Sequence, residues 1–256
     1  MNKINFRVFA QNFIRRFNSE RKFGRFWSEF WLNHISPNAI FRLWFILPLN
    51  GQARRLFNIH AISYLMKPTF VIETGTYFAS STYLFLGIPT VKQVYSIESN
   101  PGFFQIAKER YPKELLNSKL NFVLGDSKIE FEKIVNTLDK DSDTLLCYLD
   151  AHWEGDIPTV SEIQALVNWG GNWVAVIDDF LVPGLYGEGY GYDRYGDVSV
   201  DKNLFIQYPN VILMVPFESS IVETGARRGT GYAIGGEKRE ENLGALCEEL
   251  KLERIN

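Results

Sequence analysis

Short apolar runs recur along the chain from about residue 70, and helix-competent segments separate them. Five of these runs have the length and composition of buried strands. They are Phe70–Ile72, Val94–Ile97, Asn121–Leu124, Thr144–Leu149 and Trp173–Ile177. Helix start signals such as Asn100-Pro101 follow the strands. This alternation of strands and helices predicts an α/β fold with a doubly wound, parallel sheet covered on both faces.

The alternation changes after the fifth run. A loop rich in glycine and tyrosine spans Pro183–Asp197, and a helix is expected over about Ser199–Tyr208. Two further strands are predicted at Val211–Val215 and Gly231–Ile234. Glu240–Leu250 is expected to close the chain as a helix.

The amino-terminal part has a different pattern, in which aromatic residues recur at helical spacing. Phe6, Phe9, Phe13 and Phe17 share one helical face. Residues 1–60 carry ten Lys or Arg against two Asp or Glu, whereas the remaining residues carry seventeen against twenty-eight. We therefore expect a basic, aromatic-rich helical arm over residues 1–66 and a Rossmann-like domain over residues 67–256.

The arm has three candidate roles. It could pack on the main domain or on a second copy of the chain, which would make a homo-oligomer. A basic amphipathic helix can also lie in a membrane interface, so peripheral membrane contact is an alternative. A nucleic-acid partner is disfavoured because the acidic main body would repel phosphate.

Length and composition bound the class of protein. At 256 residues the chain has room for one large domain, and an apolar fraction of 46% excludes wholesale disorder. Cys147 and Cys247 are the only cysteines, too few for a disulfide framework or a thiolate zinc site. No run reaches about 18 apolar residues and the start does not resemble a signal peptide, so a cytoplasmic protein is expected.

Each of the five strands ends in or is followed by an acid. These acids are Glu73, Glu98, Asp126, Asp150 and the pair Asp178-Asp179. The carboxyl ends of parallel strands share one edge of the sheet, and ligands bind there at the point where the strand order reverses. One such acid is easily structural, but five in register indicate a ligand site.

The acids after the fourth and fifth strands suggest a cation. Asp150, Asp178 and Asp179 would repel one another unless protons or a cation intervene. Oxygen ligands favour Mg²⁺, Mn²⁺ or Ca²⁺ over zinc. His152 is then a candidate general base, with Asp150 beside it in the catalytic set. The alternatives are an acidic edge that contacts only cofactor and backbone, and a histidine that belongs to the core.

The motifs together resemble a known family. The set Glu73-x-Gly75, Glu98, Gly125-Asp-Ser127, Leu149-Asp-Ala-His-Trp153 and Ile177-Asp-Asp-Phe180 resembles the class I S-adenosylmethionine-dependent methyltransferases. Within them it is similar to the metal-dependent O-methyltransferases, especially those associated with sugar and polysaccharide biosynthesis. The likeness covers about Phe70–Ile234. It implies a mostly parallel Rossmann-like sheet with an antiparallel last strand, and divalent-metal-assisted O-methylation of a small hydroxylated acceptor such as a sugar.

The resemblance also implies site residues. The methionine end of S-adenosylmethionine would contact the turn after the first strand, the ribose would contact Glu98, and the adenine would lie beside Asp126. The full expected cofactor set is Glu73, Gly75, Thr76, Tyr77, Ser81, Glu98, Ser99, Asp126, Ser127 and Asp150. A divalent cation, with Mg²⁺ expected, would bind Asp150, Asp178 and Asp179. Ala79 stands where the family often has glycine, so a slightly different turn is expected there.

Substrate residues are expected from two segments. Tyr190 and Tyr192 lie in the glycine- and tyrosine-rich loop, which suits a lid or acceptor wall. Arg227 and Arg228 could hold an anionic acceptor. The alternatives are an ordinary surface loop and surface ion pairs.

Two other functions compete with methyl transfer. A nicotinamide-dependent oxidoreductase would share the first turn and Glu98, but it should show a fuller glycine fingerprint. A catalytically silent binding or scaffold protein could retain the fold, although it has no evident need for five strand-end acids. The sequence does not identify the acceptor.

Overall fold

The computed structural model describes residues 48–111, 118–152, 155, 157–184 and 187–256, apart from the side chains of residues 242–245 and 248–249. Most of the predicted amino-terminal arm, residues 1–47, lies outside these ranges. Its helices and its contact with a membrane or a second copy therefore stay predictions.

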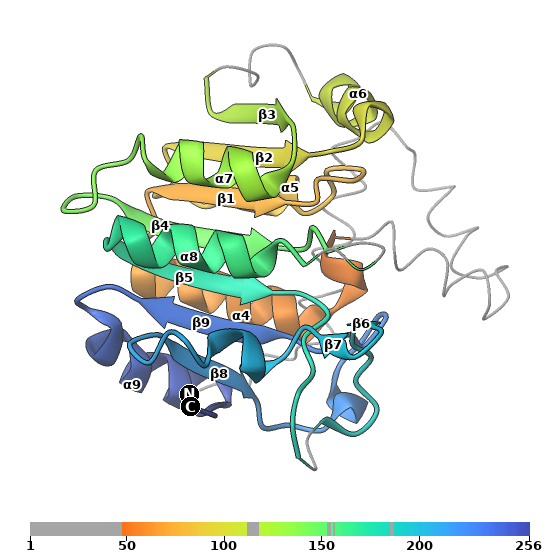
Figure 1. Ribbon diagram of the computed structural model, residues 1–256, viewed down its shortest axis with the longest axis vertical. Helices are drawn as coiled ribbons and strands as arrows, with labels where there is room; N and C mark the ends of the chain where they lie inside the picture. Colours follow the sequence, from red (N-terminus) through yellow and green to blue (C-terminus); the bar gives the residue numbers. More distant parts are fainter. Residues whose placement is uncertain (1–47, 112–117, 153–154, 156, 185–186) are drawn as a thin grey trace, which may run out of the picture. The chain divides into compact units, whose positions relative to one another are not determined.

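One mixed sheet of eight strands forms the centre of the described part of the chain (Figure 1). Its order is β10-β8-β9-β5-β4-β1-β2-β3, and the five predicted strands form its parallel half. The strands of this half are β1 (Phe70–Thr74), β2 (Gln93–Glu98), β3 (Leu120–Leu124), β4 (Thr144–Leu149) and β5 (Asn172–Ile177). The mostly parallel α/β fold predicted from the sequence is confirmed.

The other half of the sheet is antiparallel. β9 (Gly231–Gly235) lies between β5 and β8 (Ile212–Pro216) and runs antiparallel to both. A short strand that the sequence did not indicate, β10 (Leu252–Arg254), pairs with β8. The prediction of a helix over about Ser199–Tyr208 was wrong. This segment begins with the end of β7 (Val198–Ser199), which pairs with β6 (Arg194–Tyr195). It continues into the 3-10 turn η3 (Lys202–Phe205).

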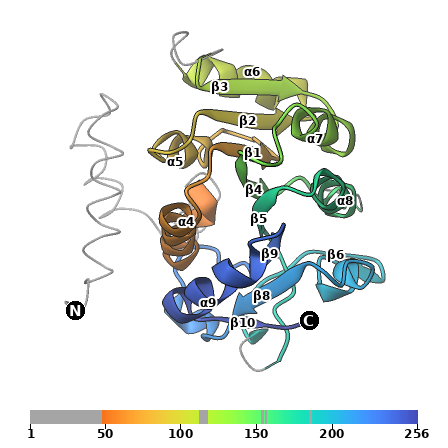
Figure 2. The same ribbon diagram turned by 90° about the vertical axis from the view of Figure 1, so that its left-hand side faces the viewer.

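Helices cover both faces of the sheet (Figure 2). Helices α7 and α8 pack together on one face, and α4 and α9 pack together on the other, where α5 also lies. The helices are α4 (Ala53–Met66), α5 (Thr82–Leu86), α6 (Pro101–Arg110), α7 (Ser127–Val135), α8 (Thr159–Trp169) and α9 (Arg239–Leu250), with 3-10 turns η1 (Pro48–Gly51) and η4 (Ser220–Val222). No helix in the described ranges is long and apolar enough to cross a membrane.

Strand β5 shows how one run of residues serves both layers. Trp173, Ala175 and Ile177 join the apolar cluster beneath α7 and α8. Val174 and Val176 join the cluster beneath α4, α5 and α9. Side chains alternate across a strand, so a strand buried on both faces needs an apolar residue at every position. Strand β5 therefore packs against the helices on both faces of the sheet, and its carboxyl end lies at the edge that holds the site.

Helix α4 belongs with the sheet by its contacts, although the sequence placed residues 53–66 in the arm. It packs against α9, and Ile59 and Ile62 are buried in the cluster beneath the sheet. A helix that precedes the first strand therefore covers one face of the sheet. The division expected at residue 67 stays a prediction.

Candidate functional site

The strand order reverses between β1 and β4, and the two strand ends are in direct contact there. The backbone N–H of Asp150 donates to the carbonyl of Thr74 (3.2 Å). Gly75 has φ +77°, and a Cβ atom at this position would lie 2.1 Å from the carbonyl oxygen of Asp150. Only glycine fits this conformation and this close approach. The glycine predicted for the first turn therefore brings the backbone of β1 against that of Asp150.

The turn after β1 continues to Ser81, and helix α5 begins at Thr82. Tyr77 and Ala79 both have left-handed backbone conformations, with φ of +48° and +54°. Such conformations interrupt a right-handed helix. The Tyr77 side chain in this turn is 43% exposed. A difference between this turn and that of the family stays a prediction.

Glu73 lies inside the protein and not at its surface. Its carboxylate is fully buried and accepts hydrogen bonds from the hydroxyls of Ser81, Thr82 and Ser96. Burial raises the pKa of Glu73, whereas these hydroxyl donors act to lower it. Through these hydrogen bonds Glu73 connects the turn after β1 to strand β2. Its contact with a cofactor stays a prediction.

Glu98 connects two backbone segments at the end of β2. One carboxylate oxygen accepts from the N–H of Tyr77 and the other from the N–H of Asn100, both at 2.8 Å. A carboxylate has about four acceptor positions, so two remain for ligand hydroxyls. Ser99 is exposed beside it. The arrangement suits a diol acceptor role at the position that the sequence predicted.

Asp126 begins helix α7. Its carboxylate accepts from the N–H of Lys128 (2.9 Å), so Asp126 is the N-cap of the helix. Ser127 is buried, and its hydroxyl interacts with the Glu162 carboxylate of α8. The Asp126 carboxylate is therefore partly engaged in capping, and the Ser127 hydroxyl is partly engaged with α8.

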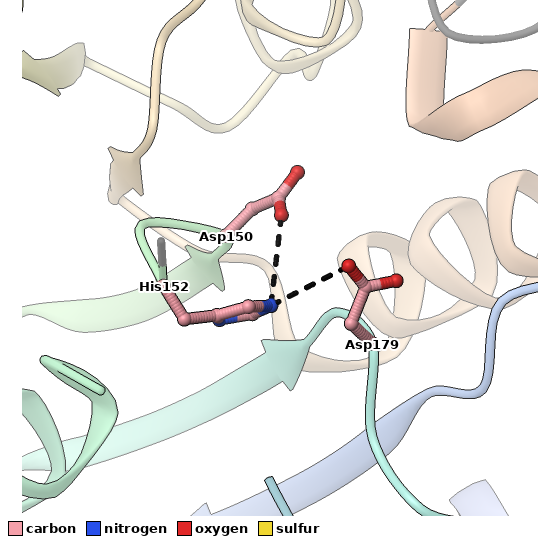
Figure 3. Close-up of side chains that lie close together, drawn as sticks. All are labelled: Asp150, His152 and Asp179. Carbon is pink, nitrogen blue, oxygen red and sulfur yellow. Dashed lines mark ion pairs between the residues drawn. The ribbon is translucent and has the colours of Figure 1, made fainter. Parts of the chain in front are cut away.

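Asp150, His152 and Asp179 converge at the ends of β4 and β5 (Figure 3). His152 Nε2 lies 3.6 Å from Asp179 Oδ2 and 4.0 Å from Asp150 Oδ1, and one ligand atom from each residue lies within 4.8 Å of the others. The His152 side chain is 1% exposed, yet neither ring nitrogen has a hydrogen-bond partner among the residues that the structure describes. Buried polar atoms are normally paired, so the cluster has the geometry of a site that holds a ligand.

The charges in this cluster perturb one another. Burial opposes ionisation of Asp150, and repulsion from Asp178 and Asp179 also raises its pKa. Because 31% of the Asp150 side chain is exposed to solvent, its burial is incomplete, and repulsion from the two neighbouring carboxylates is the better supported cause of the raised pKa. Burial alone would lower the pKa of His152, but the carboxylates of Asp179, Asp178 and Asp193 raise it. The edge thus attracts protons or another cation.

Asp178 does not join this cluster, contrary to the predicted metal triad. It is fully buried and forms an ion pair with Arg55 of α4. Asp178 also accepts from the Tyr148 hydroxyl (2.5 Å), the Asn50 amide (3.2 Å) and the N–H of Asp179 (2.7 Å). These four donors occupy Asp178 inside the protein. The side chains that could hold a cation at this edge are Asp150, His152 and Asp179.

Of the four predicted substrate residues, two are engaged with other protein groups and two are exposed. Arg228 forms ion pairs with Asp179 and Asp193 and is not free for an anionic acceptor. Tyr190 is buried in the apolar cluster, and its hydroxyl donates to the Glu218 carbonyl (3.3 Å), so it cannot stack on an acceptor. Tyr192 is 38% exposed and Arg227 is exposed. A substrate contact by these two residues stays a prediction.

Three residues of the edge were missed in the sequence. Arg55 is the one buried Lys or Arg among the described residues, and nothing in the Gln52–Met66 helix pattern distinguished it. Asp193 lies in the tyrosine-rich loop, with Oδ2 4.0 Å from His152 Nε2. Glu162 is 1% exposed on α8 and resembles an ordinary first-turn acid of a helix. The pattern of acids at strand ends could not identify these three residues, because none of them follows a strand of the parallel half of the sheet.

Comparison with known proteins gives the fold. No protein-family model and no curated protein sequence matches the chain. The structure is similar to that of a Staphylococcus aureus protein provisionally named a caffeoyl-CoA O-methyltransferase, with a TM-score of 0.51 and 17% identity over 83% of this chain and 98% of that one. A Klebsiella pneumoniae protein provisionally named an O-methyltransferase gives a TM-score of 0.50 and 14% identity over 82% and 95% of the two chains. The chain therefore has the Rossmann-like fold of these two proteins, as the resemblance in its sequence predicts.

Proposed function

We propose that the protein is an S-adenosylmethionine-dependent methyltransferase that methylates a hydroxyl of a small acceptor, such as a sugar or another hydroxylated metabolite. The observation that carries this proposal is the contact of Gly75 with Asp150 at the reversal point of the sheet. It places the turn after β1 beside the Asp150–His152–Asp179 cluster. The fold shared with two proteins named O-methyltransferases supports the same activity.

The residues along the edge fit the cofactor. Glu98 keeps acceptor capacity for the two ribose hydroxyls after binding its two backbone N–H groups. Asp126 and Ser127 follow the end of β3, where the adenine is expected. The methionine end would lie on the turn after β1, against Gly75 and Thr76. S-adenosylmethionine supplies an activated methyl group, so the protein has to align it with the acceptor and exclude water.

The Asp150–His152–Asp179 cluster fits a divalent cation in its donor set. Two carboxylates and a buried imidazole nitrogen without a partner converge within 4.8 Å. Such a mixed set of carboxylate oxygens and one imidazole nitrogen suits Mn²⁺ or another divalent transition metal better than Mg²⁺, and a bound cation would orient acceptor oxygens and lower the pKa of a hydroxyl. Asp178 stays outside the set because Arg55 occupies it.

The chain's own residues can also take up the acceptor proton. His152 Nε2 and the partly exposed Asp150 carboxylate lie close together at the ends of β4 and β5 (Figure 3). With a cation on His152 Nε2, the Asp150 carboxylate would receive the proton of a hydroxyl held there; in the absence of a cation, either group can receive it. Asp179 lies beside the same ring nitrogen.

Calorimetric titration with S-adenosylhomocysteine tests the cofactor assignment. The intact chain should bind it with a Kd in the micromolar range, and Glu98→Ala should weaken binding at least tenfold, because a charged hydrogen-bond acceptor is lost. Glu132→Ala removes an exposed carboxylate on α7 and is the matched control. Absence of binding to the intact chain in either the presence or the absence of Mn²⁺ would refute the methyltransferase assignment.

A further inference from the structure

We propose that Arg228 is the resident counter-ion of the Asp150–His152–Asp179 cluster, that Asp193 is a third acid of this site, and that a divalent cation binds there in competition with Arg228. The inference rests on the cation site of the proposed function and not on the cofactor site. It makes Arg228 a determinant of cation affinity and not a residue that binds the acceptor.

Two arginines neutralise this edge, and they differ in how firmly they are held. The Arg55 guanidinium is fully buried, with bonds to Thr230 Oγ1 (2.9 Å), the Tyr148 hydroxyl (3.2 Å) and the carbonyl of Arg228 (3.1 Å) besides Asp178. It cannot leave without exposing several buried groups. Arg55 is therefore a permanent part of the fold.

Arg228 is held differently. Its side chain is 22% exposed, and its hydrogen bonds go to two carboxylates only, from Nε to Asp179 and from Nη2 to Asp193. Its backbone is fixed independently, because Arg228 N–H donates to Gln52 Oε1 (2.6 Å) and Gln52 Nε2 donates back to the Arg228 carbonyl (2.9 Å). The guanidinium can consequently move away while the main chain stays in place.

The acids that Arg228 holds are those that face the unpaired imidazole. Asp179 Oδ1 binds Arg228, while Asp179 Oδ2 lies 3.6 Å from His152 Nε2. Asp193 Oδ1 binds Arg228, while Asp193 Oδ2 lies 4.0 Å from the same nitrogen. A cation coordinated between these atoms would sit beside the guanidinium. Like charges so close repel strongly in a partly buried site, so the guanidinium lowers the affinity for the cation.

Asp193 connects the site to the loop that carries it. Its N–H donates to the Asp179 carbonyl (3.0 Å), and the Gly229 N–H donates to the Gly191 carbonyl (2.7 Å). A Cβ atom on Gly191 would lie 3.0 Å from Arg228 Nη1, so the guanidinium lies directly against this loop. Loss of the Arg228–Asp193 ion pair would remove the side-chain contact that connects the loop to the site.

Binding of Mn²⁺, measured by electron paramagnetic resonance of the free ion and by calorimetry, tests the proposal. Arg228→Met should increase Mn²⁺ affinity roughly tenfold or more relative to the intact chain, because a positive charge leaves the site. Arg194→Met is the matched control: this arginine follows Asp193 in the chain but pairs with Asp197 and the Gly196 carbonyl, and its removal should change the affinity less than threefold. A structural role for Arg228 predicts the opposite sign, a loss of binding.

Two additional variants separate the outcomes. Asp193→Asn in the Arg228→Met background should reverse most of the gain in Mn²⁺ affinity, which would identify Asp193 as the third acid of the site. Arg228→Gln, which keeps amide donors without the charge, should show the same gain in Mn²⁺ affinity and is used if the methionine variant does not fold. S-adenosylhomocysteine binding is recorded for each variant, so failure of the cofactor assignment is seen separately. Unchanged or weaker Mn²⁺ binding in folded Arg228 variants overturns the proposal.

Discussion

Replacement of Glu162 by glutamine should make the protein more stable at alkaline pH and not at acid pH. Glu162 lies on α8 with 1% of its surface exposed, and neither carboxylate oxygen has a hydrogen bond of normal geometry. Burial raises its pKa to about 7 from an ordinary 4.5, although the hydroxyls of Ser127 and Thr74 and the charge of His152 act to lower it. Glutamine has nearly the same shape and no charge.

The magnitude follows from the pKa. A carboxyl whose pKa is higher in the folded than in the unfolded state binds its proton more tightly when folded, so stability falls as pH rises from 4.5 to about 7. At about 1.4 kcal/mol per pH unit, the whole fall is about 3 kcal/mol. Part of it is already present at pH 5. Glu162→Gln should therefore gain about 2 to 3 kcal/mol relative to the intact chain between pH 5 and pH 8.

Urea unfolding at pH 5, 6, 7 and 8 measures this difference. Glu132→Gln, which replaces an exposed carboxylate on α7, is the control and should give a difference that does not vary with pH. The same pH dependence in Glu162→Gln and in the intact chain would contradict the reasoning, because it would mean that Glu162 ionises as easily inside the protein as in the unfolded chain.

Three further substitutions test the fold around the site. Arg55→Met leaves Asp178 as an unpaired buried charge and should lower the free energy of unfolding by about 3 to 5 kcal/mol in urea titrations; the same loss in the Asp178→Asn background would argue against the ion pair. Gly75→Ala forces a Cβ against the Asp150 carbonyl at φ +77° and should cost more than about 1 kcal/mol, measured by thermal unfolding, together with loss of S-adenosylhomocysteine binding. Asn100→Ala removes the cap of α6 and should cost about 1 kcal/mol, without effect on Mn²⁺ binding.

The sequence could predict which residues meet at the edge because parallel strands impose it. Asp150 and Asp179 follow neighbouring strands whose registers pair Leu149 with Ile177, so their proximity needs no knowledge of side chains. The glycine turn and the acid at Glu98 are equally local signals. These features depend on short segments and on the strand order, which the alternation of strands and helices already indicates.

The direction of individual side chains could not be predicted in the same way. Asp178 and Asp179 are adjacent, and only the left-handed backbone of Asp179, at φ +53°, turns one toward His152 and leaves the other beneath the sheet edge. Arg55 reaches Asp178 across 123 residues of sequence, from a helix whose apolar pattern gives no sign of it. Tyr190 lies in a glycine-rich loop that suggests exposure, yet packing buries it.

The position of Arg55 has a consequence for dissecting the chain into fragments. The amino terminus of α4 is capped by the Glu223 carboxylate, which accepts from the N–H groups of Arg54 (2.9 Å) and Arg55 (3.3 Å). A fragment that starts at β1 would lose this helix, leave Asp178 without its cation and expose the apolar face that Ile59 and Ile62 cover. A truncated form of this protein that keeps the sheet should therefore also keep α4.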